Sequence, residues 1–287
     1  MNLFNKPIKK FLNIISGYEI QNLGHERFVL SKKRLTKQNI STGSLLLVEQ
    51  NGADTVLSKG LDRYLYMLNL KMILDLYQID LVLDVGANIG QFGKNLRRIG
   101  YKNKIVSFEP VSSAFNELLR ASTDDNNWDV FNFALGSENK EQKIHVSDAS
   151  IFSSFLQSND WCGQYFGDES MGNKEELVAV RRLADVLSEL IENLDSARIF
   201  LKMDTQGYDF EVFSGLGNLS EKVIGLQSET SVIPIYHSIP HITESISFFE
   251  KAGFEIAGLH PVNLEDASLR VIEYDLLMLN SKTNNKN

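Results

Sequence analysis

Apolar residues along this chain follow two alternating spacings after about residue 60. Between residues 63 and 77 they recur every three to four positions, which predicts an amphipathic helix. Compact apolar runs then predict strands over 81–85, 104–108 and 129–134, separated by helices over about 90–99 and 111–121. Strands that alternate with helices in this way build parallel sheets, so this stretch predicts a βαβαβ unit.

The same alternation resumes in the second half, after an irregular stretch. Residues 136–180 are polar but rich in glycine and aromatic side chains, and a long irregular segment inside a compact domain is usually a lid or a binding loop. The whole pattern predicts an α/β fold with a doubly wound, Rossmann-like, mostly parallel sheet covered by helices on both faces. The elements predicted beyond the insertion are helices over 183–193, 210–216 and 242–252 and strands over 199–203, 223–227, 254–259 and 271–279.

The first 60 residues carry a weaker pattern. Apolar and lysine positions within 1–17 alternate at helical spacing, and we expect this basic helix to pack on the body or on a second subunit; contact with an anionic membrane surface is the alternative. Short strands are expected over 27–30 and 45–49. The chain therefore divides into a mixed extension over 1–60, a domain over 61–280 that includes the insertion 136–180, and a disordered polar tail over 281–287.

Composition argues against several classes of protein. The 287 residues carry a formal net charge of −8, which leaves no general basic surface for nucleic-acid phosphates. Cys162 is the only cysteine, so the chain can form neither an internal disulfide nor a multi-cysteine metal site, and a reducing cytoplasm is the expected compartment. No run of the sequence approaches the ~20 apolar residues that cross a bilayer.

The most specific local pattern is the sequence D-V-G-A-N-I-G over 84–90, where the first predicted strand ends and a helix begins. Gly86 and Gly90 permit the torsions and the close approach of a turn that cradles a nucleotide, beside the free N–H groups of the helix. A dinucleotide fingerprint, G-x-G-x-x-G, fails because its second and third glycines would fall on Asn88 and Gln91. In the pattern D-x-G-x-N-x-G, the Asp84 carboxylate can instead receive an ammonium group, and Asn88 and both glycines are expected to contact the ligand.

A second carboxylate follows at the end of the next predicted strand. Glu109 lies nineteen positions after Gly90, and Pro110 then breaks the strand beside the same expected ligand. A carboxylate in this place accepts two hydrogen bonds from a ribose diol. The turn and Glu109 together predict a ligand of the adenosine type.

These stretches resemble S-adenosylmethionine-dependent methyltransferases, and more closely the FkbM family, over about 81–279. The resemblance rests on LVLDVGANIGQFGKNL, VSFEPVSSAFNELL, NFALGS and LKMDTQGYDFEVFSGL. It implies a class I methyltransferase fold with a seven-stranded sheet, and S-adenosylmethionine as the cofactor, with its methionine part at 84–90 and its ribose at Glu109. It also implies an adenine-side contact near Phe133 and Ala134, and it makes Ser153 a contact of the cofactor or the acceptor.

The later motif departs from the commoner family form. That form is D-V-E-G, whereas this chain has D-T-Q-G over 204–207. Asp204 ends a buried strand at the edge where open α/β sheets bind ligands, so we expect it to face the same crevice as Glu109. Capping of the helix that follows is the alternative role for Asp204.

Methyl transfer from a sulfonium to an alcohol requires an aligned acceptor oxygen and a base for one proton. The candidate bases are Asp204, Glu229 at the end of the next strand, and His237 on a polar loop. The reference pKa of histidine, about 6.5, suits the task, whereas a carboxylate needs burial to raise its pKa into range. Two carboxylates at strand ends could instead hold Mg²⁺, but the sequence offers no third ligand, so catalysis without a metal is favoured.

The expected function is O-methylation of a hydroxyl, and family analogy favours a sugar of a glycan or glycosylated metabolite as the acceptor. One alternative is an NAD-dependent nucleotide-sugar oxidoreductase, which the glycine spacing disfavours. Another is a non-catalytic binding module on the same fold. The aromatic residues of 147–173 fit a lid over the ligands, or equally a hydrophobic plug or the contact of a homodimer.

Overall fold

The computed structural model describes residues 19–24, 27–31, 35–41, 44–49, 54–191, 193–194 and 196–285. The basic helix expected within 1–17 lies outside the described residues. Backbone contacts divide the chain into two units, Met1–Leu61 and Asp62–Asn287. None of the described helices is long and apolar enough to cross a membrane.

The first unit contains two antiparallel hairpins. Strands β1 (Glu19–Gly24) and β2 (Arg27–Ser31) form one, and β3 (Leu35–Ser41) and β4 (Ser44–Glu49) form the other. The sequence predicts β2 and β4, whose apolar residues form short runs. It does not predict β1 and β3, because polar residues interrupt the alternation in both. Helix α2 (Asp54–Leu76) follows the hairpins.

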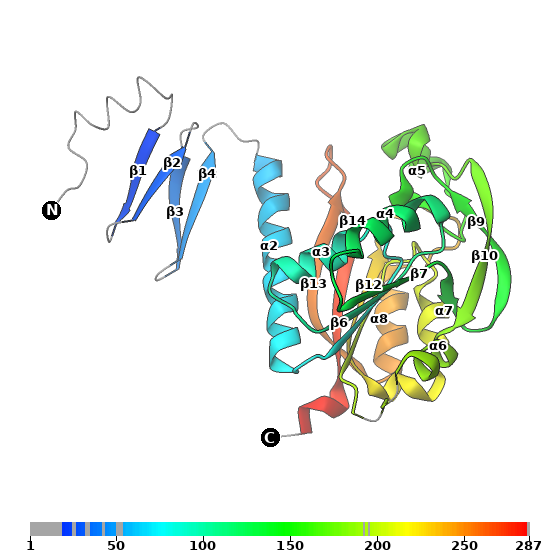
Figure 1. Ribbon diagram of the computed structural model, residues 1–287. Helices are drawn as coiled ribbons and strands as arrows, with labels where there is room; N and C mark the ends of the chain where they lie inside the picture. The colour runs from blue at the N-terminus through cyan, green and yellow to red at the C-terminus, as the bar shows by residue number, and fades with distance from the viewer. Residues whose placement is uncertain are drawn as a thin grey trace. The chain divides into compact units, whose positions relative to one another are not determined.

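A seven-stranded sheet forms the centre of the second unit, in the order β13-β14-β12-β11-β5-β6-β7 (Figure 1). Neighbouring strands from β12 to β7 run parallel, and β14 is antiparallel to both of its neighbours. The prediction of a doubly wound, mostly parallel, seven-stranded sheet is therefore confirmed. The strands are β5 (Leu81–Val85), β6 (Lys104–Phe108), β7 (Trp128–Phe131), β11 (Ile199–Met203), β12 (Val223–Ser231), β13 (Phe254–Leu264) and β14 (Val271–Asn280).

Helices cover both faces of this sheet because alternate residues of each central strand point to opposite sides. Val82 of β5 packs with buried residues of α2, α3 and α4, whereas its neighbour Leu83 packs with α6, α7 and α8. All five residues of β5 and of β11 are buried, and each strand is apolar apart from one charged residue, Asp84 or Lys202. The helices are α3 (Gln91–Arg98), α4 (Ser112–Ser122), α6 (Leu183–Leu190), α7 (Asp209–Ser214) and α8 (Ile242–Lys251).

The insertion has a structure of its own. Its strand β10 (Lys174–Arg182) pairs with β9 (Lys140–Val146) on one side and with β8 (Ala134–Gly136) on the other, which forms a three-stranded sheet at the side of the main one (Figure 1). Between β9 and β10 lie the 3-10 helices η1 (Ser150–Phe152) and η2 (Asp168–Ser170), with α5 (Asp160–Phe166) between them. The insertion therefore places several aromatic residues next to the main sheet.

The end of the chain differs from the sequence prediction. The structure gives Ser281–Asn285 a 3-10 helix, η4, where a disordered tail is expected. Asn280 accounts for the difference, because its side chain accepts a hydrogen bond from the Lys282 N–H and its carbonyl accepts one from the Thr283 hydroxyl.

Candidate active site

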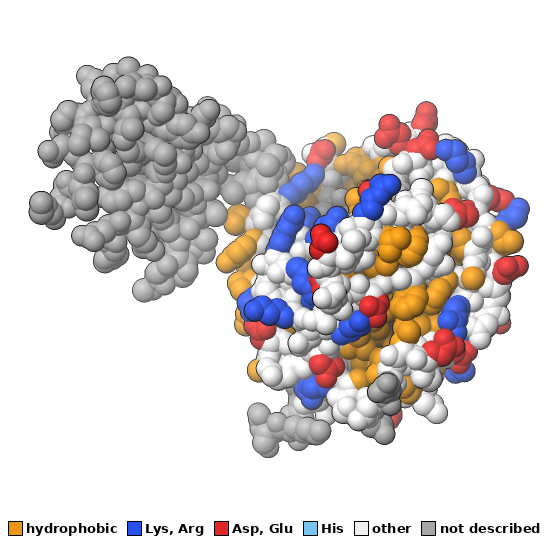
Figure 2. Space-filling view, in the orientation of Figure 1, with side chains coloured by type: hydrophobic (Ala, Val, Ile, Leu, Met, Phe, Trp, Pro, Cys, Tyr) orange, Lys and Arg blue, Asp and Glu red, His pale blue; other side chains and the backbone are white. Residues whose placement is uncertain are grey.

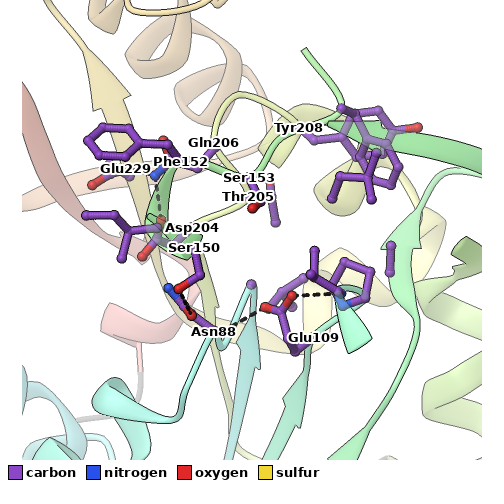
Figure 3. A pocket seen from close by; sticks show the side chains of 18 of the residues that line it. Asn88, Glu109, Ser150, Phe152, Ser153, Asp204, Thr205, Gln206, Tyr208 and Glu229 are labelled. Carbon is purple, nitrogen blue, oxygen red and sulfur yellow. Dashed lines mark hydrogen bonds between the residues drawn. The ribbon is translucent and has the colours of Figure 1, made fainter. Parts of the chain in front are cut away.

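A cavity of about 440 Å³ lies at the carboxyl ends of the parallel strands. Residues that follow β5, β6 and β11 line it, together with Glu229 of β12 and residues 150–153 of the insertion. Figure 3 shows Asn88 and Glu109 on one side of this cavity, and Gln206 and Glu229 on another. The position is the one that open parallel sheets use for ligands.

Gly86 lets the turn after β5 pass close to the backbone at the end of β11. This residue lines the cavity with a φ of +73°, and a Cβ there would lie 2.0 Å from the carbonyl oxygen of Asp204. Asn88 also has a positive φ, +48°, and its side chain accepts a hydrogen bond from the Ser150 hydroxyl of the insertion. Gly90 caps α3 with a φ of +83° but faces Leu118 and packed interior, outside the cavity lining.

Asp84, expected to receive the ammonium group of the ligand, lies beneath the cavity and does not line it. Its side chain is fully buried, accepts a hydrogen bond from the Ser107 hydroxyl, and lies 3.0 Å from the Lys202 ammonium. Lys202 also contacts Asp204 at 3.4 Å and donates to the Gly86 carbonyl at 3.0 Å. Burial lowers the pKa of Lys202, but the two carboxylates outweigh it and raise that pKa above its usual range.

Glu109 lines the cavity at the end of β6. Its carboxylate accepts hydrogen bonds from two backbone N–H groups, Asn88 on Oε2 at 2.8 Å and Val111 on Oε1 at 2.9 Å. Burial nonetheless raises the pKa of the Glu109 carboxyl to about 7. Each oxygen has a second lone pair, so the group can accept two more hydrogen bonds. Pro110, also expected at this site, lies in the lining beside it.

The residues expected near an adenine divide between the cavity and the core. Ala134 lines the cavity at the start of β8. The ring of Phe133 lies outside the lining and packs on Phe108, with 5.5 Å between ring centroids. Ser153 lines the cavity, and its hydroxyl accepts a hydrogen bond from the Ser147 N–H.

The other end of the cavity is rich in carboxylates. Asp204, Glu229 and Glu273 line it, and Asn263 donates a hydrogen bond to Glu273. Burial, followed by the charge of Asp204, raises the pKa of Glu229 well above its ordinary value. Burial also raises the pKa of Glu273, to about 7. This end can therefore accept hydrogen bonds, and a proton, from a bound molecule.

His237, a candidate base in the sequence, is exposed and lies outside the cavity lining. Its neighbour Tyr236 is buried instead, and the Tyr236 hydroxyl lies 2.9 Å from Oε1 of Gln206. The sequence analysis also misses Lys202 and Glu273 as site residues. Lys202 is the single charge of β11, and Glu273 is one of two charges in the otherwise largely apolar β14, which is the signal that could have identified them.

Metal ligands are not grouped in the described part of the chain: no three His, Cys, Asp or Glu residues there are placed to hold an ion.

Comparison with known proteins identifies related sequences. A family model described as Methyltransferase FkbM domain matches residues 84–256, which is more than half of the chain. A protein called Methyltransferase 1, from Beauveria bassiana (strain ARSEF 2860), is 23% identical over 197 residues, covering 63% of this chain and 74% of that protein.

Solved structures show more distant likeness. A magnesium protoporphyrin IX methyltransferase from Synechocystis PCC 6803 with bound SAM has a TM-score of 0.42 and 10% identity, covering 82% of this chain and 86% of that chain. Fibrillarin from Aeropyrum pernix, in complex with S-adenosyl-L-methionine, has a TM-score of 0.44 and 13% identity, covering 91% of this chain and 99% of that chain.

Proposed function

Because the chain belongs to the FkbM family of S-adenosylmethionine-dependent methyltransferases, we propose that it transfers a methyl group to a sugar hydroxyl, with Glu229 as the proton acceptor. The observation that carries this proposal is the cavity itself, which has Glu109 at one end and a set of carboxylates at the other.

The Glu109 end fits the nucleoside part of the cofactor. Gly86 lines this end without a side chain, and the free lone pairs of Glu109 suit the two hydroxyls of a ribose. Ala134 and Ser153 line the same cavity and are further contacts. S-adenosylmethionine supplies an electrophilic methyl group, and the protein has to bind it, align an acceptor and accept one proton.

The carboxylate end fits a hydroxyl-rich acceptor. Asp204, Glu229 and Glu273 offer acceptor oxygens, which are the partners that neighbouring sugar hydroxyls require. Phe152 and Phe166 line the cavity from the insertion, and aromatic faces pack on the apolar faces of sugar rings. The insertion then serves as a lid that excludes water from the reaction.

Glu229 is the proposed proton acceptor because it combines position with a raised pKa. Its side chain lines the cavity, and burial raises its pKa, which makes the carboxylate a stronger base. His237 is exposed outside the cavity, and Asp204 is already held by Lys202. We propose that the reaction needs no metal, so activity should survive dialysis against a chelator.

The acceptor class also follows from charge. The chain has a formal net charge of −8, and Figure 2 shows basic and acidic side chains interspersed over one face of the second unit. Nucleic-acid binding depends on basic surface. A small molecule or glycan is therefore the proposed acceptor, and the cytoplasm is the proposed compartment because a lone cysteine needs no oxidising environment.

Two measurements test this function in sequence. Calorimetry with S-adenosylhomocysteine should show binding, and binding of NAD in its place would overturn the cofactor assignment. Transfer of labelled methyl from S-adenosylmethionine to a panel of nucleotide sugars and glycans should then depend on Glu229. Glu229→Gln should lower kcat about 10²- to 10⁴-fold, whereas the exposed Glu250→Gln in α8 should leave it unchanged. Label that reaches only amines or carbon would refute the sugar hydroxyl as the acceptor.

A further inference from the structure

Gln206 occupies an unusual place at the carboxylate end of the cavity. It lies in the turn between β11 and α7 with a φ of +54°, and Gly207 follows with a φ of +96°. The Ser154 hydroxyl of the insertion donates to the Gln206 carbonyl at 2.7 Å. The backbone is thus held in a conformation that non-glycine residues seldom adopt, which places the side chain in the cavity lining.

The Gln206 amide bridges two carboxylates. Its Nε2 lies 3.1 Å from Oδ1 of Asp204 and 2.5 Å from Oε2 of Glu229 (Figure 3). On the opposite side, Oε1 faces the hydroxyl of Tyr236, a residue only 1% exposed. The reverse orientation of the amide would set its carbonyl oxygen against both carboxylates, so the contacts determine which end faces Glu229.

The surroundings of Glu229 make this contact important. Four carboxylates act on it by charge: Asp204, Asp209, Glu273 and Asp275. Burial raises the pKa of the Tyr236 hydroxyl, and the charge of nearby Glu229 raises it further. Lys202, the buried cation on β11, is bound to Asp84 and Asp204. Within the described residues, the Gln206 amide is the donor that the structure gives to the Glu229 side chain.

We propose that Gln206 is a positioning residue whose amide stabilises the ionised form of the Glu229 carboxylate and aims it at the acceptor, with Tyr236 fixing the orientation of the amide. This inference rests on the proposed role of Glu229. A hydrogen bond to a charged acceptor is among the stronger ones in proteins. Gln206 thereby sets the lowest pH at which Glu229 can take a proton from an acceptor hydroxyl.

The test follows the titration of Glu229 directly, without an acceptor. Infrared difference spectra of the full chain, compared with those of Glu229→Gln, isolate the carboxyl band of Glu229 as the pH is raised. Gln206→Met keeps the side-chain volume and removes both polar atoms. Its Glu229 midpoint should move up by about one to two pH units, the equivalent of losing one hydrogen bond to a charged group. Gln157→Met, an exposed change in the insertion, is the matched control and should not shift it.

A second variant keeps the inference testable if the first one fails to fold. Tyr236→Phe retains the ring and releases the amide, so the midpoint should move in the same direction by less than about one unit. An unchanged midpoint in Gln206→Met, or in Tyr236→Phe where Gln206→Met is unfolded, overturns the proposal.

Kinetics separate the failure of this inference from failure of the proposed function. In Gln206→Met the acid limb of kcat/KM should move to higher pH, full rate should return well above it, and affinity for S-adenosylhomocysteine should stay unchanged. A uniform loss of rate at every pH would overturn the positioning role. Failure of the wild type to bind S-adenosylhomocysteine would instead refute the proposed function, while the titration of Glu229 would still decide the role of Gln206.

Discussion

The affinity for the cofactor should depend on pH through Glu109. Burial raises the pKa of this carboxyl to about 7, against two backbone hydrogen bonds that lower it. Ribose hydroxyls donate to the ionised form, so binding favours the carboxylate and releases a proton wherever the free protein holds one. Affinity for S-adenosylhomocysteine should therefore rise as the pH rises through 7, the opposite of the behaviour of a site that needs a protonated acid.

The size of the effect follows from the pKa. With a value of about 7, the carboxyl is about nine-tenths protonated at pH 6 and about nine-tenths ionised at pH 8. The dissociation constant should thus be about tenfold larger at pH 6 than at pH 8. Glu109→Gln loses the charge that the ribose contacts, and binding at pH 8 should weaken about 10- to 100-fold, which corresponds to ~1.5–3 kcal/mol for a hydrogen bond to a charged group.

Calorimetry at pH 6, 7 and 8, in buffers of different ionisation enthalpy, measures both the affinity and the proton released. Glu109→Gln should bind with little pH dependence, which removes any titration of the ligand or of the other carboxylates from the comparison. Glu117→Gln, an exposed change on α4, should behave as the wild type. Equal affinity of the wild type at pH 6 and 8, or the same pH dependence in Glu109→Gln, would refute this account of the ribose contact.

Three further predictions concern stability. Gly86→Ala should lower the free energy of unfolding in urea by about 2–4 kcal/mol, because the new Cβ meets a backbone carbonyl at a residue with positive φ. The control is Gly60→Ala in α2, where nothing lies near the new Cβ. This change should raise the free energy of unfolding by about 0.5–1 kcal/mol. Lys202→Met leaves the buried Asp84 carboxylate without its cation and should lower the free energy of unfolding by about 3–5 kcal/mol; a loss below about 1 kcal/mol would show that this ion pair is dispensable. Burial raises the pKa of both Glu273 and Asp275 to about 7, so the native state binds more protons than the unfolded chain between pH 4.5 and 7. The free energy of unfolding should therefore be lower at pH 8 than at pH 5. Urea titrations at the two pH values measure this difference.

The sequence predicts the central sheet well because its strands are buried on both faces and form continuous apolar runs. The prediction of a strand over 271–279 agrees with β14 to one residue at its end. Strand β13 continues to Leu264, beyond the predicted 254–259 and through Pro261. It is an edge strand, where a proline without an N–H is tolerated, so the local rule that ends a strand at proline fails there.

At the site, the sequence predicts those residues whose positions are set by a neighbouring turn or strand end. Gly86 and Glu109 belong to this class, since a turn and a strand end place them in the cavity. It does not predict contacts that depend on distant segments. Tyr236 reaches Gln206 from thirty positions away, and Lys202 reaches Asp84 from a different strand. No local pattern shows that one carboxylate becomes an ion-pair partner while another stays open to a ligand.

The burial of Asp84 gives that residue a role that a motif alone does not reveal. Its carboxylate forms an ion pair with Lys202, and Lys202 in turn donates a hydrogen bond to the Gly86 carbonyl and contacts Asp204. One ammonium group thus joins the turn after β5, where we propose that the cofactor binds, to the end of β11, whose Gln206 contacts Glu229. If the cofactor's ammonium bound Asp84 directly, it would have to displace Lys202 from a site with no exposed surface. The contacts favour the other arrangement, in which Asp84 and Lys202 fix the distance between the turn after β5 and the end of β11. If the proposed cofactor turn and proton acceptor are correct, alignment of the two halves of the reaction is a property of the sheet itself.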